Sequence, residues 1–150
     1  MKKVLLFTFA FIFIFLVGCS HIEDTNGAED FSIVEISDEE ILDGGSSMSV
    51  GSISSTVNGV HKLSIKKFSG VEELLEIEAD SEKTIEVSIK NEVKDGNFMI
   101  VLILNDQIIK KVYANTSYND ELSFTGELEF VIVGESANFK MEYSFKEWRW

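Results

Sequence analysis

The chain has 150 residues, of which 26 are acidic and 13 are Lys or Arg, giving a formal net charge of −13 at pH 7. This length suits one folded domain with a substantial hydrophobic core. The acidic balance argues against nucleic acid as a partner, and it is expected to keep the body of the protein away from anionic headgroups. Proline is absent, so turns are expected at Gly, Asn, Asp and Ser.

The first twenty residues have the organisation of a secretion signal. Lys2 and Lys3 precede an apolar run from residue 4 to residue 17, which is shorter than the roughly 20 residues that a transmembrane helix needs. The sequence LVGC at 16–19 resembles the lipobox of bacterial lipoproteins, in which the cysteine receives a diacylglycerol and becomes the new N-terminus. We therefore expect residues 1–18 to be a signal peptide, cleaved between Gly18 and Cys19.

Cys19 is the only cysteine of the chain, so it has no disulfide partner within the molecule. The alternatives are an ordinary signal peptide followed by a free thiol, or an uncleaved anchor. Lipidation explains a lone exported cysteine better, because two or more acyl chains retain a protein on a membrane stably. The expected location is the extracytoplasmic face of the cell membrane, with the lipid as the attachment.

Residues 19–47 are expected to form an acidic, lipid-anchored linker. Nine carboxylates and no Lys or Arg occur between residues 20 and 47. A short strand at 31–36 is one way for this segment to contact the domain, with residues 44–47 as a hinge.

From Met48 onward the pattern of apolar residues has a period of two, which is typical of strands with one buried face. The alternating sets are Leu63 and Ile65; Leu75, Ile77 and Ala79; Ile85, Val87 and Ile89; Leu128, Phe130 and Ile132; and Phe139, Met141, Tyr143 and Phe145. A helix is indicated only weakly, at 71–75. Residues 93–97, with the sequence VKDGN, predict a hairpin turn.

Residues 98–104 are apolar at every position, which predicts a central strand covered on both faces. Asn105-Asp106 is expected to turn the chain into the next strand. About eight strands joined by polar turns predict a single all-β domain over residues 48–150, an antiparallel β-sandwich of the jelly-roll-like or immunoglobulin-like kind.

The order of these segments from about Gly59 to Phe145 resembles a group of small Gram-positive lipoproteins that carry a β-sandwich domain. The resemblance rests on HKLSIKKFSG at 61–70, TIEVSIKN at 84–91, KDGNFMIVLILND at 94–106 and LSFTGELEFVIVGESANFKMEYSF at 122–145. It departs at Asn138, where Gly is usual in the group. These are determinants of strands and turns, so the resemblance implies a fold and no activity.

A catalytic or metal site has little support in the sequence. His61 is the one histidine of the domain, and no Gly-x-Ser-x-Gly elbow accompanies it. Zinc needs more His and Cys than the chain offers. Turns at Asp43, Asn105-Asp106 and Asn119–Glu121 supply oxygens of the kind that calcium prefers, but none matches an EF-hand loop. The acidic stretch 72–82 is expected to be a solvated outer face.

The C-terminal segment EWRW at 147–150 does not fit the alternating pattern. Trp148 and Trp150 are expected either to cover a sheet edge or to form an exposed aromatic surface, with Tyr118 as a further candidate for stacking against a sugar. We predict a non-enzymatic binding or structural role at the cell envelope, toward an unknown protein or glycan and without cofactor or metal. The alternative is a carbohydrate-binding module that uses these aromatic residues.

Overall fold

The structure is a computed structural model that describes residues 35–147. This part of the chain contains one short helix and an antiparallel sheet of five strands. The elements are α1 (Asp38–Leu42), β1 (Ser47–Val50), β2 (Ile53–Val57), β3 (Val60–Leu104), β4 (Gln107–Tyr113) and β5 (Ser117–Glu147). The predicted signal peptide and lipidation site lie outside the described residues, as do Trp148 and Trp150.

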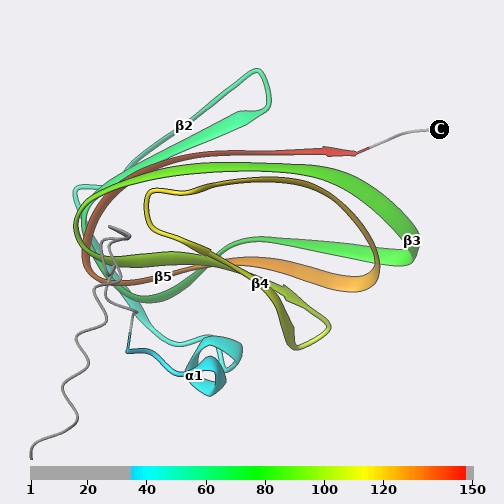
Figure 1. Ribbon diagram of the computed structural model, residues 1–150, viewed down its shortest axis with the longest axis horizontal. Coiled ribbons are helices and arrows are strands. Elements are labelled where there is room, and N and C mark those ends of the chain that lie inside the picture. The colour runs from blue at the N-terminus through cyan, green and yellow to red at the C-terminus, as the bar shows by residue number, and fades with distance from the viewer. Residues whose placement is uncertain (1–34, 148–150) are drawn as a thin grey trace, which may run out of the picture.

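β3 and β5 are long enough to run through two facing layers. Both strands bend repeatedly, so that successive segments of each pair with the other in both layers (Figure 1). The first layer has the spatial order 53–57, 60–65, 139–147, 84–93 and 117–124. The second layer has the order 47–50, 67–79, 126–134, 97–104 and 107–113. The eight segments after Val60 form an antiparallel β-sandwich with jelly-roll connectivity, which confirms the predicted fold class.

The main core lies between the two layers and follows from the alternation of the sequence. Ile85, Val87 and Ile89 are buried, and they occur at every second position of β3. Phe139 of β5 is central to this core, since its ring stacks on that of Phe98 with centroids 4.0 Å apart and meets Phe68 edge-on at 6.1 Å. The predicted strands with one buried face are confirmed.

Residues 98–104 form an interior segment of the second layer, with β5 on one side and β4 on the other. Phe98, Ile100 and Leu102 face the main core. The alternate side chains, such as Met99 and Val101, belong to a second buried cluster on the outer face of this layer, which also contains Ile41 of α1. The prediction of a strand covered on both faces is confirmed, and α1 is part of the cover.

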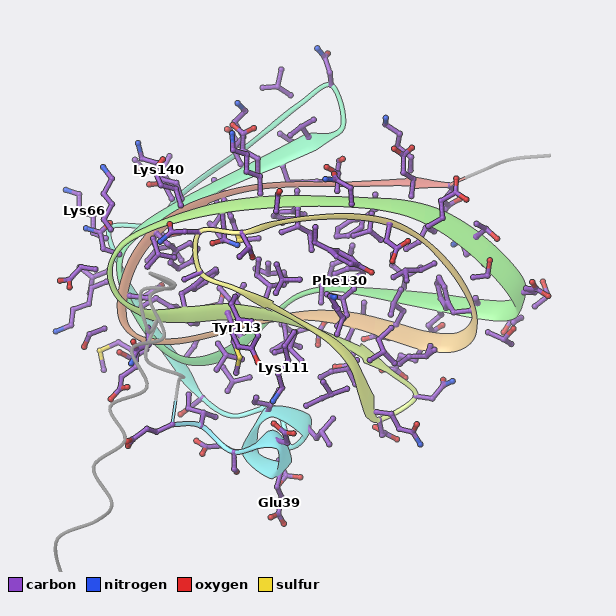
Figure 2. The ribbon with its side chains drawn as sticks, viewed as in Figure 1. Glu39, Lys66, Lys111, Tyr113, Phe130 and Lys140 are labelled. Atoms are coloured by element: carbon purple, nitrogen blue, oxygen red, sulfur yellow. The ribbon has the colours of Figure 1, made fainter. Side chains whose placement is uncertain are left out.

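The helix α1 corrects the predicted boundary of the domain. Ser37 caps it by accepting a hydrogen bond from the Glu40 amide at 3.2 Å, and acidic residues occupy its first turn, where the helix dipole favours them. Ile41 is 1% exposed, and Lys111 of β4 forms a 2.5 Å salt bridge to Asp38 (Figure 2). Residues 38–47 therefore belong to the folded domain instead of a solvated linker.

Residues 44–47, predicted as a hinge, lie against the sandwich in this structure. Gly45 lies against the side chain of Val71, and β1 begins at Ser47. The weakly indicated helix at 71–75 is a strand that pairs with residues 130–133 of β5.

The expected hairpin at 93–97 is a corner between the layers. Residues 84–93 and 97–104 both pair with β5 and not with each other. Gly96 has a φ of +76°, and a Cβ there would lie 2.5 Å from the Ser136 carbonyl oxygen. The close approach of this corner to β5 therefore requires glycine. A local turn signal does not distinguish a reversal of the chain from a sharp bend. The turn at Asn105-Asp106 is confirmed, and both residues have positive φ angles, as a two-residue hairpin requires.

Candidate functional site

Of the predicted site residues, only Tyr118 falls in the part of the chain that the structure describes. It lies across from Ile89 on the inner side of the first layer and is half-buried. Its hydroxyl donates to Asp120 Oδ2 at 3.1 Å, and Lys110 Nζ lies 5.2 Å from the ring centroid. Burial and the carboxylate of Asp120 raise the pKa of its phenol. These contacts make Tyr118 a packed edge residue, whose ring already has a cation over it.

His61 lies next to the opposite edge of the first layer, one strand in from β2 and close to the start of β3. Its ring stacks on Tyr143 of β5, with centroids 4.9 Å apart and planes inclined by 12°. Its Nδ1 is 3.0 Å from Thr56 Oγ1. A catalytic triad orients its histidine with a carboxylate, whereas this ring nitrogen has a hydroxyl as its partner. The stacking and the hydroxyl contact fix the imidazole in place.

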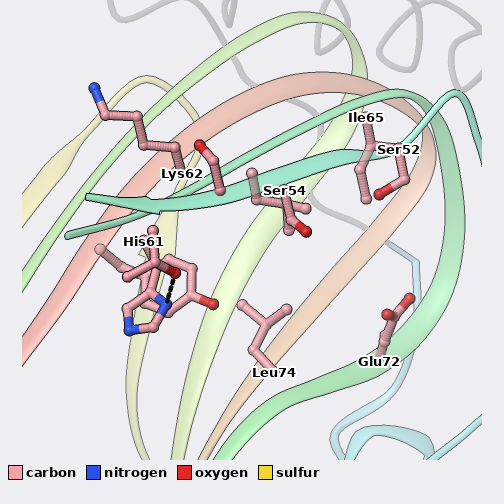
Figure 3. A pocket seen from close by; sticks show the side chains of 11 residues that line it. Ser52, Ser54, His61, Lys62, Ile65, Glu72 and Leu74 are labelled. Atoms are coloured by element: carbon pink, nitrogen blue, oxygen red, sulfur yellow. Dashed lines mark hydrogen bonds between the residues drawn. The ribbon is translucent and has the colours of Figure 1, made fainter. Parts of the chain in front are cut away.

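The stacked pair borders a cavity of about 550 Å³, a size typical of ligand pockets. The cavity lies where the β2–β3 hairpin of the first layer covers the beginning of segment 67–79 of the second layer. Figure 3 shows Ser54 and His61 on one side of this space and Glu72 and Leu74 on the other. Ser52, Thr56 and Tyr143 also line the cavity.

The chemistry of the pocket combines hydroxyls, one carboxylate and two rings. Glu72 accepts a hydrogen bond from Ser47 Oγ at 3.0 Å, which leaves other carboxylate lone pairs for a ligand. Lys62 also borders the cavity, but its ammonium is bound to Glu142 at 2.7 Å. That salt bridge lowers the pKa of Glu142. Burial raises the pKa of the Tyr143 phenol further above neutral pH, where the hydroxyl is a hydrogen-bond donor in any case.

Sequence analysis missed this pocket because the pattern of β2 is inverted. All five residues of β2 are exposed, and the side of the strand toward the pocket, where a sandwich strand normally carries apolar residues, has Ser54 and Thr56. Alternation alone assigns the aliphatic residues to the core. The signal is a run of three hydroxyl residues, Ser54, Ser55 and Thr56, in an edge strand, but it can be interpreted only once the register with β3 is known.

A second group of carboxylates gathers on the outer face of the second layer. Glu76 pairs in register with Glu129, and Glu78 with Glu127. Repulsion from Glu127 raises the pKa of Glu76, whereas burial first and Glu127 second raise that of Glu129. Within residues 35–147, no three His, Cys, Asp or Glu side chains are placed to hold a metal ion, and this includes the turns considered for calcium. The carboxylates of this outer face are negatively charged surface groups. Unlike Glu72, they do not line the pocket.

None of the helices in the described part of the chain has both the length and the apolar character needed to cross a membrane.

Comparisons with known proteins give a likeness of fold only. No protein-family model and no curated protein matches the chain. A family 29 carbohydrate-binding module, solved as a point mutant with mannohexaose, is 12% identical, with a TM-score of 0.37, over 68% of this chain and 79% of the module. The family 11 carbohydrate-binding module of a cellulosomal cellulase from Clostridium thermocellum is 14% identical, with a TM-score of 0.33, over 69% and 86%.

A cupin superfamily protein from Desulfitobacterium hafniense is 17% identical, with a TM-score of 0.28, over 67% of this chain and 75% of its own. Identities and TM-scores this low carry no argument about what the chain binds. The chain is a β-rich domain with carbohydrate-binding modules and a cupin among its structural neighbours.

Proposed function

We propose that this chain is a non-enzymatic binding protein of the cell envelope, held to the membrane through Cys19, and that its sandwich binds an uncharged saccharide. The observation that carries the proposal is the pocket at the edge of the first layer. There, the stacked rings of His61 and Tyr143 lie beside hydroxyls and the carboxylate of Glu72.

A saccharide matches the donors and acceptors of this pocket. Each sugar hydroxyl both donates and accepts a hydrogen bond, as do the hydroxyls of Ser54 and Thr56, while Glu72 accepts strongly. Leu74 and the edge of the His61–Tyr143 pair provide apolar area for the C–H face of a sugar ring.

The charges of the pocket favour a neutral ligand. An anion would meet the carboxylate of Glu72, and the nearest ammonium, Lys62, is already occupied by Glu142. A bare cation would find only one carboxylate. Hydroxyl groups avoid both penalties, because they bind a single carboxylate without bringing a charge of their own.

Binding to an array of envelope and plant glycan fragments tests the proposal, followed by calorimetric titration with any retained glycan. Glu72→Gln keeps the shape of the side chain and is expected to weaken binding at least tenfold. Glu78→Gln, on the acidic outer face, is the matched control and should bind as the parent chain does. Retention of no glycan would contradict the saccharide assignment.

The predicted aromatic residues provide a second arm of this experiment. If a Trp148→Ala, Trp150→Ala double variant loses glycan binding and Glu72→Gln does not, the saccharide site lies at the C-terminal aromatic residues instead of the pocket. If only Glu72→Gln loses binding, the pocket is the site.

The anchor is proposed on the resemblance of residues 16–19 to a lipobox and on the absence of another cysteine. Mass spectrometry of the mature N-terminus from the native host checks it. The expected species begins at Cys19 and carries a diacylglycerol. An unmodified thiol at Cys19, or a chain that still begins at Met1, would refute it.

A further inference from the structure

β1 and β2, which both pair with β3, each expose two aliphatic side chains on the outside of the sandwich. Met48, Val50, Ile53 and Val57 are 71%, 56%, 70% and 55% exposed. Their partners across the strands are Ser69, Lys67, Ser64 and Val60, whereas neighbours such as Phe68 and Ile65 point into the core. The β2–β3 hairpin stands away from the rest of the first layer (Figure 1). Four strongly exposed aliphatic side chains within ten residues of the chain favour a surface with a partner.

The same region is the positive end of an acidic molecule. Residues 47–71 contain Lys62, Lys66 and Lys67 but no Asp or Glu, although the whole chain has a net charge of −13. Lys140 of β5 adds a fourth ammonium, across from Ser64, and Figure 2 shows Lys66 and Lys140 at one end of the sandwich. Within residues 35–147, Lys66 and Lys67 form no salt bridge.

The carboxylates described above do not neutralise the positive charge of Lys66 and Lys67. The cluster around Glu76 and Glu129 begins nine residues further along β3 than Lys67, up to about 30 Å away at roughly 3.3 Å per residue, which exceeds the Debye length of about 8 Å at physiological salt. On the first layer, Glu142 is bound by Lys62, and Glu92 lies across from Lys140. Net charge predicts repulsion from anionic headgroups, but the distribution of charge leaves one face that attracts them.

We propose that this basic hairpin surface, formed by Met48, Val50, Ile53, Val57, Lys66 and Lys67, docks on the surface of an anionic lipid bilayer. Aliphatic side chains would enter the region between headgroups and acyl chains, while the lysines contact lipid phosphates. The charge complementarity favours this occupant over a second copy of the chain, because two such surfaces would bring like charges together. The proposal does not depend on the saccharide pocket, whose Ser54 and Thr56 point to the other face of β2.

Co-sedimentation with lipid vesicles tests the docking without the lipid anchor. The probe is residues 20–150, because both core clusters lie within residues 36–145 and are retained. This chain is expected to bind vesicles of phosphatidylglycerol and phosphatidylcholine, not vesicles of phosphatidylcholine only, and to dissociate at high salt. Lys66→Gln with Lys67→Gln should weaken binding about thirtyfold, at roughly 1 kcal/mol for each lysine near an anionic surface.

An apolar variant separates insertion from simple attraction of charges. Ile53→Thr with Val57→Thr keeps β-branched residues in the strand, and it should weaken binding at least about fivefold. Ile109→Thr on β4, where Ile109 is also exposed, is the matched control and should bind as the parent does. The proposal is overturned if residues 20–150 do not bind anionic vesicles, or if the hairpin variants and the control bind equally. It is also overturned if the hairpin variants instead abolish a dimer seen in sedimentation velocity.

Discussion

Replacement of Ile41 by Ala tests whether α1 is part of the folded domain. Ile41 is the buried residue of this helix, 1% exposed, and it packs with Met99, Val101 and Val131 on the outer face of the second layer. The change removes three carbon groups at about 0.8 kcal/mol each, or about 2.4 kcal/mol before any cavity remains. Since α1 is short and can settle toward the sheet, we expect a loss of about 2–3 kcal/mol, at the low end for core Ile→Ala changes.

Urea unfolding followed by fluorescence or circular dichroism measures this loss as a fall in the midpoint of about 1 M or more, with an unchanged slope. Leu42→Ala is the control, because Leu42 belongs to the same helix and is 40% exposed. It should cost less than about 1 kcal/mol. Equal, small effects of the two changes would refute the reasoning, and would restore residues 38–47 to the linker that the sequence predicts.

Three further changes address the sheet and its charges. Asn91→Ala should lower the free energy of unfolding, measured in urea, by about 2–3 kcal/mol. The buried amide of Asn91 donates hydrogen bonds to the carbonyls of Tyr113 and Thr116, and both carbonyls would lose this partner. An effect below about 1 kcal/mol would contradict this. Gly70→Ala should lower the melting temperature by several degrees, since Gly70 has a φ of +106° and a Cβ there would overlap the Ser46 carbonyl oxygen. An unchanged melting temperature would show that the start of β1 can move aside without loss of stability. Glu129→Gln should raise the melting temperature at pH 7. The pKa of Glu129 is raised in the folded state, so its carboxylate destabilises the folded protein as the pH rises through that pKa. The gain from the substitution should shrink toward pH 4, and a gain independent of pH would argue against repulsion as the cause.

The sequence predicts what depends on local periodicity. Alternation identifies the strands with one buried face, and the uniformly apolar residues 98–104 identify a strand covered on both faces. The corner at 93–97 is not predictable in this way, because Gly96 satisfies a reversal and a bend equally well and only pairing with β5 decides between them. The helix α1 is too short to show a periodic pattern, and Ile41 becomes buried only because another layer lies beneath it.

The pocket is predictable only in part. His61 stands out as the single histidine of the domain, but Tyr143 reads as an ordinary member of an alternating strand, and Glu72 as one of several solvated carboxylates. They meet because residue 61 pairs with residue 143 and because the second layer brings Glu72 beneath the hairpin, a separation of 82 residues that no local pattern encodes. The inward hydroxyls of β2 break the usual rule for sandwich strands, as residues of a binding site often do.

The winding of β3 and β5 also sets an order for folding. β3 forms one arm of a long antiparallel ribbon, and β4 followed by β5 forms the other arm. Residues 104 and 107 pair next to the tip, and residues 61 and 143 pair at the far end. Loop closure is least costly at the tip, so the ribbon is expected to zip from the middle of the chain outward. The contact between His61 and Tyr143 is then expected to form late, and the pocket that these two rings border is complete only when the far end of the ribbon has paired.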